Sequence, residues 1–154
     1  KWASEKKPTE SGMAATVDQG NYPVREANKT LIADKDSILQ RLNKEPASLI
    51  NALRREQHEG RGGVNYGRKG HIKNSINLPA IEHVNQDNTF KSINELRTIF
   101  SETLKHNEVI AYCGGGIAAT SVALALDMLG HKNVKVYDAS LTEWASDETL
   151  PMSI

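Results

Sequence analysis

The stretch Tyr112-Cys113-Gly114-Gly115-Gly116-Ile117-Ala118-Ala119-Thr120 decides the fold, because it joins an apolar segment to a helical pattern. Residues 109–112 predict a buried strand that runs into Cys113. From about Ala118 a helix is predicted, with one apolar face made by Val122, Ala125, Leu126 and Leu129. Three consecutive glycines permit a tight turn and the close approach of a ligand. A strand, a glycine-rich turn and a helix therefore follow one another here.

Backbone amides in such a turn, together with the helix N-terminus, form a site for an anion. The same dipoles stabilise a thiolate, so Cys113 is a candidate nucleophile. The alternative is a buried cysteine beside a phosphate-binding turn. The segment lacks the Lys-Ser/Thr ending of a P-loop, so it is not a nucleotide-binding loop of that type.

Strand patterns continue on both sides of this stretch. Residues 48–53, 75–78 and 134–137 are short apolar runs, and the second of them is stopped by Pro79. A mainly polar segment, residues 54–73, separates the first two and predicts a loop with at most a helical turn.

Helical patterns alternate with these strands. Asp34 or Asp36 is expected to cap a short helix that Pro46 ends, with an apolar face of Ile38, Leu39 and Leu42. Ser92-Ile93-Asn94-Glu95 is a capping box, and it opens a helix whose buried face is predicted as Ile93, Leu96, Ile99, Phe100 and Leu104. Gly130 suits the end of the helix after Cys113. This alternation predicts an α/β fold with a parallel sheet covered on both faces.

Composition excludes several classes of protein. The 154 residues carry 19 basic and 19 acidic side chains, so no nucleic-acid or anionic-membrane partner is expected. A single cysteine excludes an internal disulfide framework, and no metal site or cofactor is expected. No apolar run is long enough for a transmembrane helix. A lone cysteine favours a reducing compartment such as the cytoplasm, although a mature periplasmic protein would have the same composition.

Four segments in order resemble the rhodanese superfamily. The cysteine segment resembles that family's active-site loop, and residues 70–79 resemble its G-H-I-P-G-A-x-N-[LIV]-P signature. Residues 50–60 stand where the family has D-x-R followed by E-x-x-x-G, and residues 136–144 resemble its closing V-Y-D-G-S-W-x-E-W. The resemblance covers about residues 31–152. It implies a five-stranded, mostly parallel sheet with helices on both faces.

The resemblance also implies a chemistry. Cys113 would attack a small sulfur donor, carry the sulfur as a persulfide, and pass it to a thiol or cyanide acceptor. The persulfide would be cradled by the backbone amides of Gly114, Gly115, Gly116, Ile117 and Ala118. The residue six places after Cys113 is Ala119 rather than Arg, which argues against the phosphatase branch of the superfamily. Cys-Gly-Gly-Gly-Ile-Ala is closer to the mercaptopyruvate-type loop than to the thiosulfate-type loop, and its lack of charge predicts weak electrostatic capture of thiosulfate.

The chain departs from the family pattern at several places. Asn51-Ala52-Leu53 replaces D-x-R, so Leu53 stands where many members have an anion-binding Arg. Arg61 is the predicted replacement for substrate binding, with Arg68 and Lys69 as further sources of positive charge, against the alternative of a solvated loop. Asn74 replaces a signature glycine, which is a mild change because Asn tolerates left-handed backbone.

Three further polar residues in these motifs are interpreted as structural. His71 is expected to be a hydrogen-bonding residue rather than a catalytic base. Asp138 and Ser140 are expected to cap the last helix.

The two tryptophans begin the same tripeptide, Trp-Ala-Ser, at residues 2–4 and 144–146. The second copy ends the rhodanese-like segment, so the first is interpreted as the end of a preceding repeat, as in tandem rhodanese proteins. The predicted organisation is a remnant at 1–12, a linker at 13–30 and the cysteine-bearing domain at 31–154. An upstream rhodanese domain is then a partner in the full-length protein.

Two functions follow from the sequence. The first is a sulfurtransferase that uses Cys113 and either a 3-mercaptopyruvate-like donor or thiosulfate. The second is a weakly active or inactive module that binds a sulfur carrier or has a regulatory role. An intact cysteine on its glycine-rich turn favours the first, and Leu53 and the uncharged loop favour the second.

Overall fold

A five-stranded parallel sheet forms the centre of the molecule, as seen in the computed structural model, which describes residues 1–42, 48–64 and 66–154. The strand order is β1-β6-β5-β2-β4, and all four pairings are parallel. The strands are β1 (Ile32–Ala33), β2 (Leu49–Asn51), β4 (Ile76–Asn77), β5 (Val109–Tyr112) and β6 (Val134–Tyr137). The expected fold is confirmed, although β2 and β4 are shorter than the runs 48–53 and 75–78.

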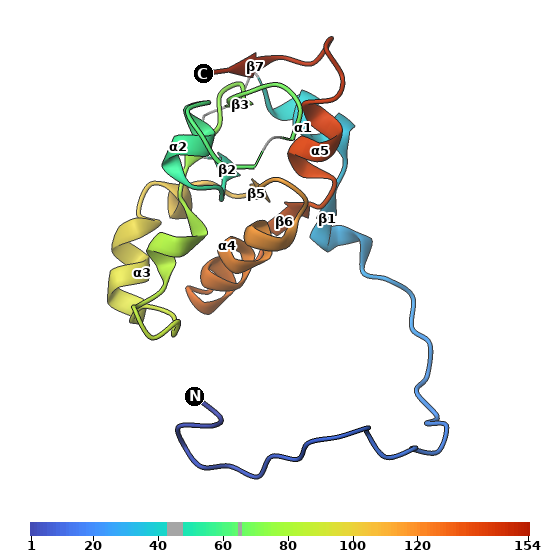
Figure 1. The fold of residues 1–154 in the computed structure, drawn as a ribbon. Helices are drawn as coiled ribbons and strands as arrows, with labels where there is room; N and C mark the ends of the chain where they lie inside the picture. The colour runs from blue at the N-terminus through green and yellow to red at the C-terminus, as the bar shows by residue number, and fades with distance from the viewer. Residues whose placement is uncertain (43–47, 65) are drawn as a thin grey trace.

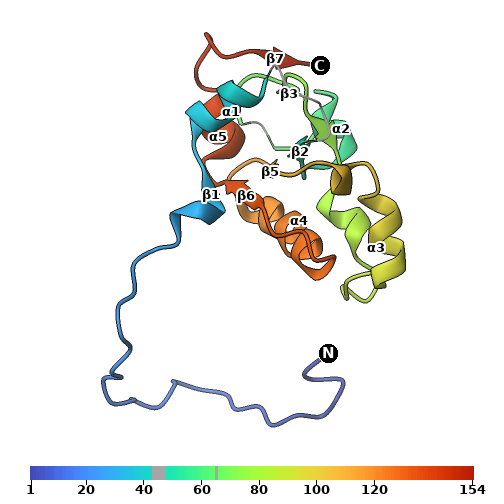
Figure 2. The ribbon, with the colours of Figure 1, turned by 180° about the vertical axis from the view of Figure 1, so that it is seen from behind.

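Helices cover both faces of this sheet (Figures 1 and 2). On one side lie α3 (Ile93–Ile99) and α4 (Ile117–Met128), and on the other lie α1 (Lys35–Arg41), α2 (Arg55–His58) and α5 (Ser140–Trp144). Short 3-10 turns connect them: η1 (Lys29–Leu31), η3 (Ala80–His83) and η4 (Thr103–Lys105). A separate antiparallel pair joins β3 (His71–Ile72) to β7 (Met152–Ser153) near the C-terminus.

Helix starts agree with the capping residues in the sequence. Asp34, not Asp36, caps α1, because its carboxylate accepts a hydrogen bond from the Ser37 amide at 2.8 Å. The Ser92–Glu95 capping box opens α3 as predicted. Helix α4 begins at Ile117, one residue before the predicted start. The predicted stop of the first helix at Pro46 lies outside the described residues.

Some residues that are predicted to lie on the buried faces of helices do not lie there. Leu39 of α1 and Ile93 of α3 are exposed, because each of these short helices buries only a narrow stripe, centred on Ile38 in α1 and on Leu96 in α3. Leu104 does not belong to α3, which ends at Ile99; it lies in η4 and is partly buried against the core.

The core around β5 includes Ile110, Tyr112, Phe100, Leu126 and Trp144, all essentially inaccessible to solvent. Its largest side chain, Trp144, also donates from Nε1 to the carbonyl oxygen of Pro151. This bond ties the chain end that carries β7 to helix α5.

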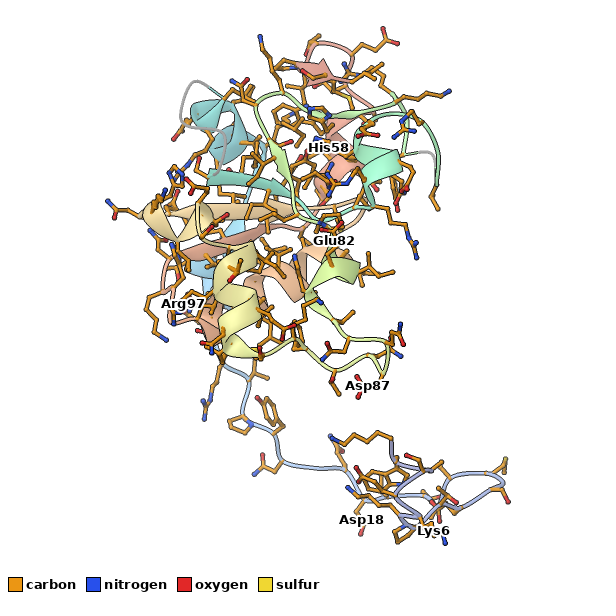
Figure 3. The ribbon with its side chains drawn as sticks, turned by 90° about the vertical axis from the view of Figure 1, so that its left-hand side faces the viewer. Lys6, Asp18, His58, Glu82, Asp87 and Arg97 are labelled. Atoms are coloured by element: carbon orange, nitrogen blue, oxygen red, sulfur yellow. The ribbon has the colours of Figure 1, made fainter. Side chains whose placement is uncertain are left out.

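Residues 1–31 are exposed throughout, and of these only η1 lies against the sheet, next to β6; residues 1–28 extend away from it (Figures 1 and 3). Figure 3 labels Lys6 and Asp18 in this tail, well separated from the domain. Trp2 is 58% exposed and donates from Nε1 to the carbonyl oxygen of Pro8, while Lys7 lies over its ring. The division into remnant, linker and domain is still a prediction. In the described part of the chain no helix has the length and apolar character needed to cross a membrane.

Candidate active site at Cys113

Cys113 follows β5 directly, at the carboxyl end of a strand that lies between β6 and β2. Ligands of open α/β sheets bind at this edge, where loops from neighbouring parallel strands meet. The cysteine is 2% exposed and is the only one in the chain. Four hydrophobic residues of β5 hold its backbone in the centre of the sheet, so the position of the thiol is set by the fold.

A buried hydroxyl shapes the turn after Cys113. The Ser140 Oγ accepts from the amides of Cys113 at 3.0 Å and Gly116 at 3.2 Å, and donates to the carbonyl oxygen of Tyr137 at 2.6 Å. Ser140 is fully buried and has φ +51°, a backbone conformation uncommon for a residue with a Cβ. The prediction that Ser140 caps the last helix is wrong, because Ser140 is the first residue of α5 and its hydroxyl bonds the cysteine loop instead.

Carbonyl groups of the same loop bond to the first turn of α5. The Cys113 carbonyl accepts from the Leu141 amide, and the Gly114 carbonyl accepts from both the amide and the hydroxyl of Thr142. Among the described residues no side chain, that of Asp138 included, caps α5. Asp138 instead lies beside Gly116, where an added Cβ would be 2.3 Å from Oδ1. Glycine is therefore required at 116 both by this contact and by its φ of +82°.

These bonds leave part of the predicted cradle open. Within the described chain, no acceptor is recorded for the amides of Gly114, Gly115, Ile117 and Ala118, the last two at the start of the 12-residue helix α4. Gly116 differs, because its amide already donates to Ser140. Free amides at a helix start favour a negative charge. The loop can thus stabilise a thiolate or a bound anion without any charged side chain.

A cavity of about 240 Å³ reaches this loop through two lining residues that contact it, Tyr66 and Leu141, while residues 113–118 themselves are not among its lining. Leu53 and Leu141 line it, as does Tyr66, whose ring lies against Gly114. Three cations also line it: Arg61, Arg68 and Lys69. Leu53, which stands at the position of the family's Arg, therefore gives the cavity an apolar wall there.

The three cations have different surroundings. Arg68 donates to four backbone carbonyls at 2.6–3.2 Å, those of Trp144, Ala145, Asp147 and Leu150. Arg61 forms an exposed ion pair with Glu59, which lowers the pKa of that carboxyl. No partner is recorded for Lys69 in the described residues. The sequence did not distinguish the three, since all lie in one polar loop.

Asn51 links the strand edge to α2. Its Oδ1 accepts from the Leu53 amide, and its Nδ2 lies 3.2 Å from Nδ1 of His58, the side chain labelled on α2 in Figure 3. His58 stacks on His71, whose Nδ1 lies 2.8 Å from the His58 carbonyl oxygen. Burial, and to a lesser degree His71, lowers the pKa of His58 to about 4. The structural hydrogen bond expected of His71 is present, and Asn74 has the expected left-handed φ of +63°.

Comparison with known proteins adds to this geometry. A family model described as Rhodanese-like domain matches residues 34–147. The 3-mercaptopyruvate sulfurtransferase of Escherichia coli K12 is 35% identical over 124 residues, which are 79% of this chain and 42% of that protein. The sulfur carrier protein TtuD of Thermus thermophilus is 28% identical over 168 residues, which are 99% of this chain and 58% of that protein. The chain thus spans about half the length of these curated relatives.

Solved structures with the same fold include the Tum1 protein of Saccharomyces cerevisiae, with a TM-score of 0.66 and 23% identity over 78% of this chain and 45% of that one. The anaerobic ergothioneine biosynthesis enzyme of Chlorobium limicola has a TM-score of 0.72 and 21% identity, over 80% of this chain and 32% of that one. At such identities the likeness concerns the fold alone. The family model covers most of the chain and both structures share its architecture, and we conclude that the chain belongs to the rhodanese-like domain family.

Proposed function

We propose that this domain is a sulfurtransferase that carries sulfane sulfur on Cys113. The observation that supports it is the cysteine at the carboxyl end of β5, followed by a turn with four amides that lack a recorded acceptor among the described residues. A thiolate and a persulfide both need such donors, because each is an anion in a buried place. The names of the sulfurtransferase and sulfur-carrier relatives agree with this proposal.

The reaction is a pair of displacements at sulfur. The Cys113 thiolate attacks the outer sulfur of the donor, and the remainder of the donor leaves with the bonding electron pair, as sulfite from thiosulfate or as the enolate of pyruvate from 3-mercaptopyruvate. The persulfide on Cys113 is then attacked by a thiolate or cyanide, which takes the outer sulfur and returns Cys113 to the thiolate. No external oxidant or reductant is required.

Donor binding is assigned to the loop amides and to the cavity cations. The transferred sulfur is held by backbone amides of the loop, those of Gly114, Gly115, Ile117 and Ala118. The amide of Gly116 is bonded to Ser140, so Gly116 contributes only the backbone turn. Arg61 is already paired with Glu59, so Lys69 is the better ligand for the donor's anionic end. Lys69→Gln is expected to raise KM for both donors more than the matched change Arg61→Gln. An equal effect of the two changes would contradict this assignment.

A binding or regulatory module is the second candidate, and Leu53 favours it. This side chain gives the cavity wall an apolar surface at the position where the family resemblance implies an anion-binding Arg. Such a module would bind a sulfur-carrying partner without rapid turnover. An upstream rhodanese domain, proposed from the tripeptide repeat, would complete the site in either case.

Mass spectrometry separates the two candidates. The chain is mixed with thiosulfate or with 3-mercaptopyruvate, and its mass is measured before and after addition of dithiothreitol. The sulfurtransferase proposal predicts a gain of one sulfur atom that the thiol removes, and no gain in Cys113→Ser. Absence of the gain with both donors would favour the binding module.

A further inference from the structure

Tyr66 occupies the space directly over the residue that follows the cysteine. A Cβ built on Gly114 would lie 2.0 Å from Cζ of Tyr66 and 2.3 Å from its hydroxyl oxygen. Real Cβ atoms essentially never approach a neighbour this closely, so any side chain at 114 would displace the phenol. Gly114 cannot move away, because its carbonyl is bonded twice to Thr142. The ring therefore fills the place that a side chain at position 114 would take.

The phenol also faces the cavity. Tyr66 lines the 240 Å³ cavity and is half-buried, while Cys113, the residue before Gly114, is 2% exposed. In the described part of the chain the Tyr66 hydroxyl has no recorded hydrogen-bond partner. A phenol at the boundary of a cavity has an apolar ring to exclude water and a donor to offer a ligand.

We propose that Tyr66 is a substrate-binding residue whose hydroxyl donates a hydrogen bond to an oxygen of the sulfur donor, while its ring shields Cys113. The proposal rests on the sulfurtransferase function above and names the group that sets donor preference. Gly114 and Tyr66 act as a pair. Because Gly114 has no side chain, the Tyr66 phenol takes its place and supplies the contact to the ligand. Donors with a hydrogen-bond-accepting oxygen close to the transferred sulfur fit this arrangement.

The first test compares Tyr66→Phe with the parent chain. The ring stays and the hydroxyl is lost, so KM for 3-mercaptopyruvate is expected to rise about five- to tenfold, the effect of one hydrogen bond. The alkylation rate of Cys113 by iodoacetamide should be unchanged, because the ring still covers the thiol. An unchanged KM for both donors would overturn the hydrogen-bonding role.

The second test is a double-mutant cycle with Tyr66→Ala and Gly114→Ala. Tyr66→Ala is expected to speed alkylation of Cys113 severalfold, and this readout is specific because the chain has no other cysteine. Gly114→Ala should raise KM in the parent chain by displacing the phenol, and should change KM little once Tyr66→Ala has removed the ring. Equal effects in both backgrounds would overturn the pairing, and thermal unfolding of each variant identifies any that fails to fold.

The two proposals fail in different ways. If the parent chain takes up no sulfur, the proposed function fails, while the alkylation rates of the Tyr66 variants still report whether the ring covers the thiol. If the parent chain takes up sulfur and Tyr66→Phe has the same KM as the parent for both donors, only the proposed role of Tyr66 fails.

Discussion

Replacing Ser140 tests whether one buried hydroxyl holds the cysteine loop. Ser140→Ala removes an acceptor for two amides and a donor to one carbonyl, at a residue with no solvent exposure. Each lost hydrogen bond costs about 1 kcal/mol, so we expect a loss of about 3 kcal/mol in the free energy of unfolding. The variant should still fold, because domains of this kind have about 5–15 kcal/mol of stability.

Ser140→Gly separates the hydroxyl from the backbone. The φ of +51° strains a residue with a Cβ by about 1–2 kcal/mol, and glycine relieves this strain. Glycine also makes the unfolded chain more flexible, and the additional entropy lost on folding offsets about 0.5–1 kcal/mol of this gain. Ser140→Gly should therefore be less destabilising than Ser140→Ala by about 0.5–1 kcal/mol.

Urea unfolding followed by the fluorescence of buried Trp144 measures these differences. Ser146→Ala is the matched control, because the Ser146 hydroxyl makes one exposed bond to Glu143 and its loss should change stability by less than about 0.5 kcal/mol. The reasoning is refuted if Ser140→Ala is as mild as the control. It is also refuted if Ser140→Gly is no more stable than Ser140→Ala, since the strain would then be absent.

Three further predictions concern stability. His83 is fully buried, and burial lowers its pKa to about 4, so between pH 6.5 and 4 the unfolded chain binds a proton that the folded chain does not. The free energy of unfolding should therefore decrease as the pH is lowered from 6.5 to 4, and it should decrease less steeply in His83→Leu. Urea unfolding at several pH values measures this. Arg68→Met should lose about 2–4 kcal/mol through its four carbonyl bonds, whereas exposed Arg61→Met should lose almost nothing, and similar thermal unfolding of both variants would contradict this. Deleting residues 1–12 should leave the unfolding free energy nearly unchanged because this segment packs on no part of the core, and a loss of several kcal/mol would mean that it is integral to the domain.

Much of the fold was predictable because its signals are local. β5, β6 and the helix after Cys113 are marked by short apolar runs and by glycine at the turn, and these determine structure within a few residues. The capping box at Ser92 is equally local. Burial at the ends of short helices was not predictable, since an apolar residue such as Ile93 in the first turn fits the helical pattern whether or not another element covers it.

The site was predictable only where it is contiguous. Cys113 and its glycines are adjacent in sequence, but Ser140 lies 27 residues from Cys113 and Tyr66 lies 47 residues before it. The identity of a serine does not indicate which distant backbone amides its hydroxyl will bond. One signal was available for Ser140: β5 and β6 were expected to be parallel, and the loops after neighbouring parallel strands meet at one edge of a sheet.

The support of the cysteine loop by other segments matters for engineering. Residues 113–118 take their shape from Ser140 and Thr142, and the Tyr66 ring lies against Gly114. Arg68, two residues after Tyr66, bonds the carbonyls at the end of the same helix α5. Grafting the six-residue loop onto another scaffold would therefore transfer the nucleophile without its geometry, and a working transplant has to move three separate stretches of the chain together.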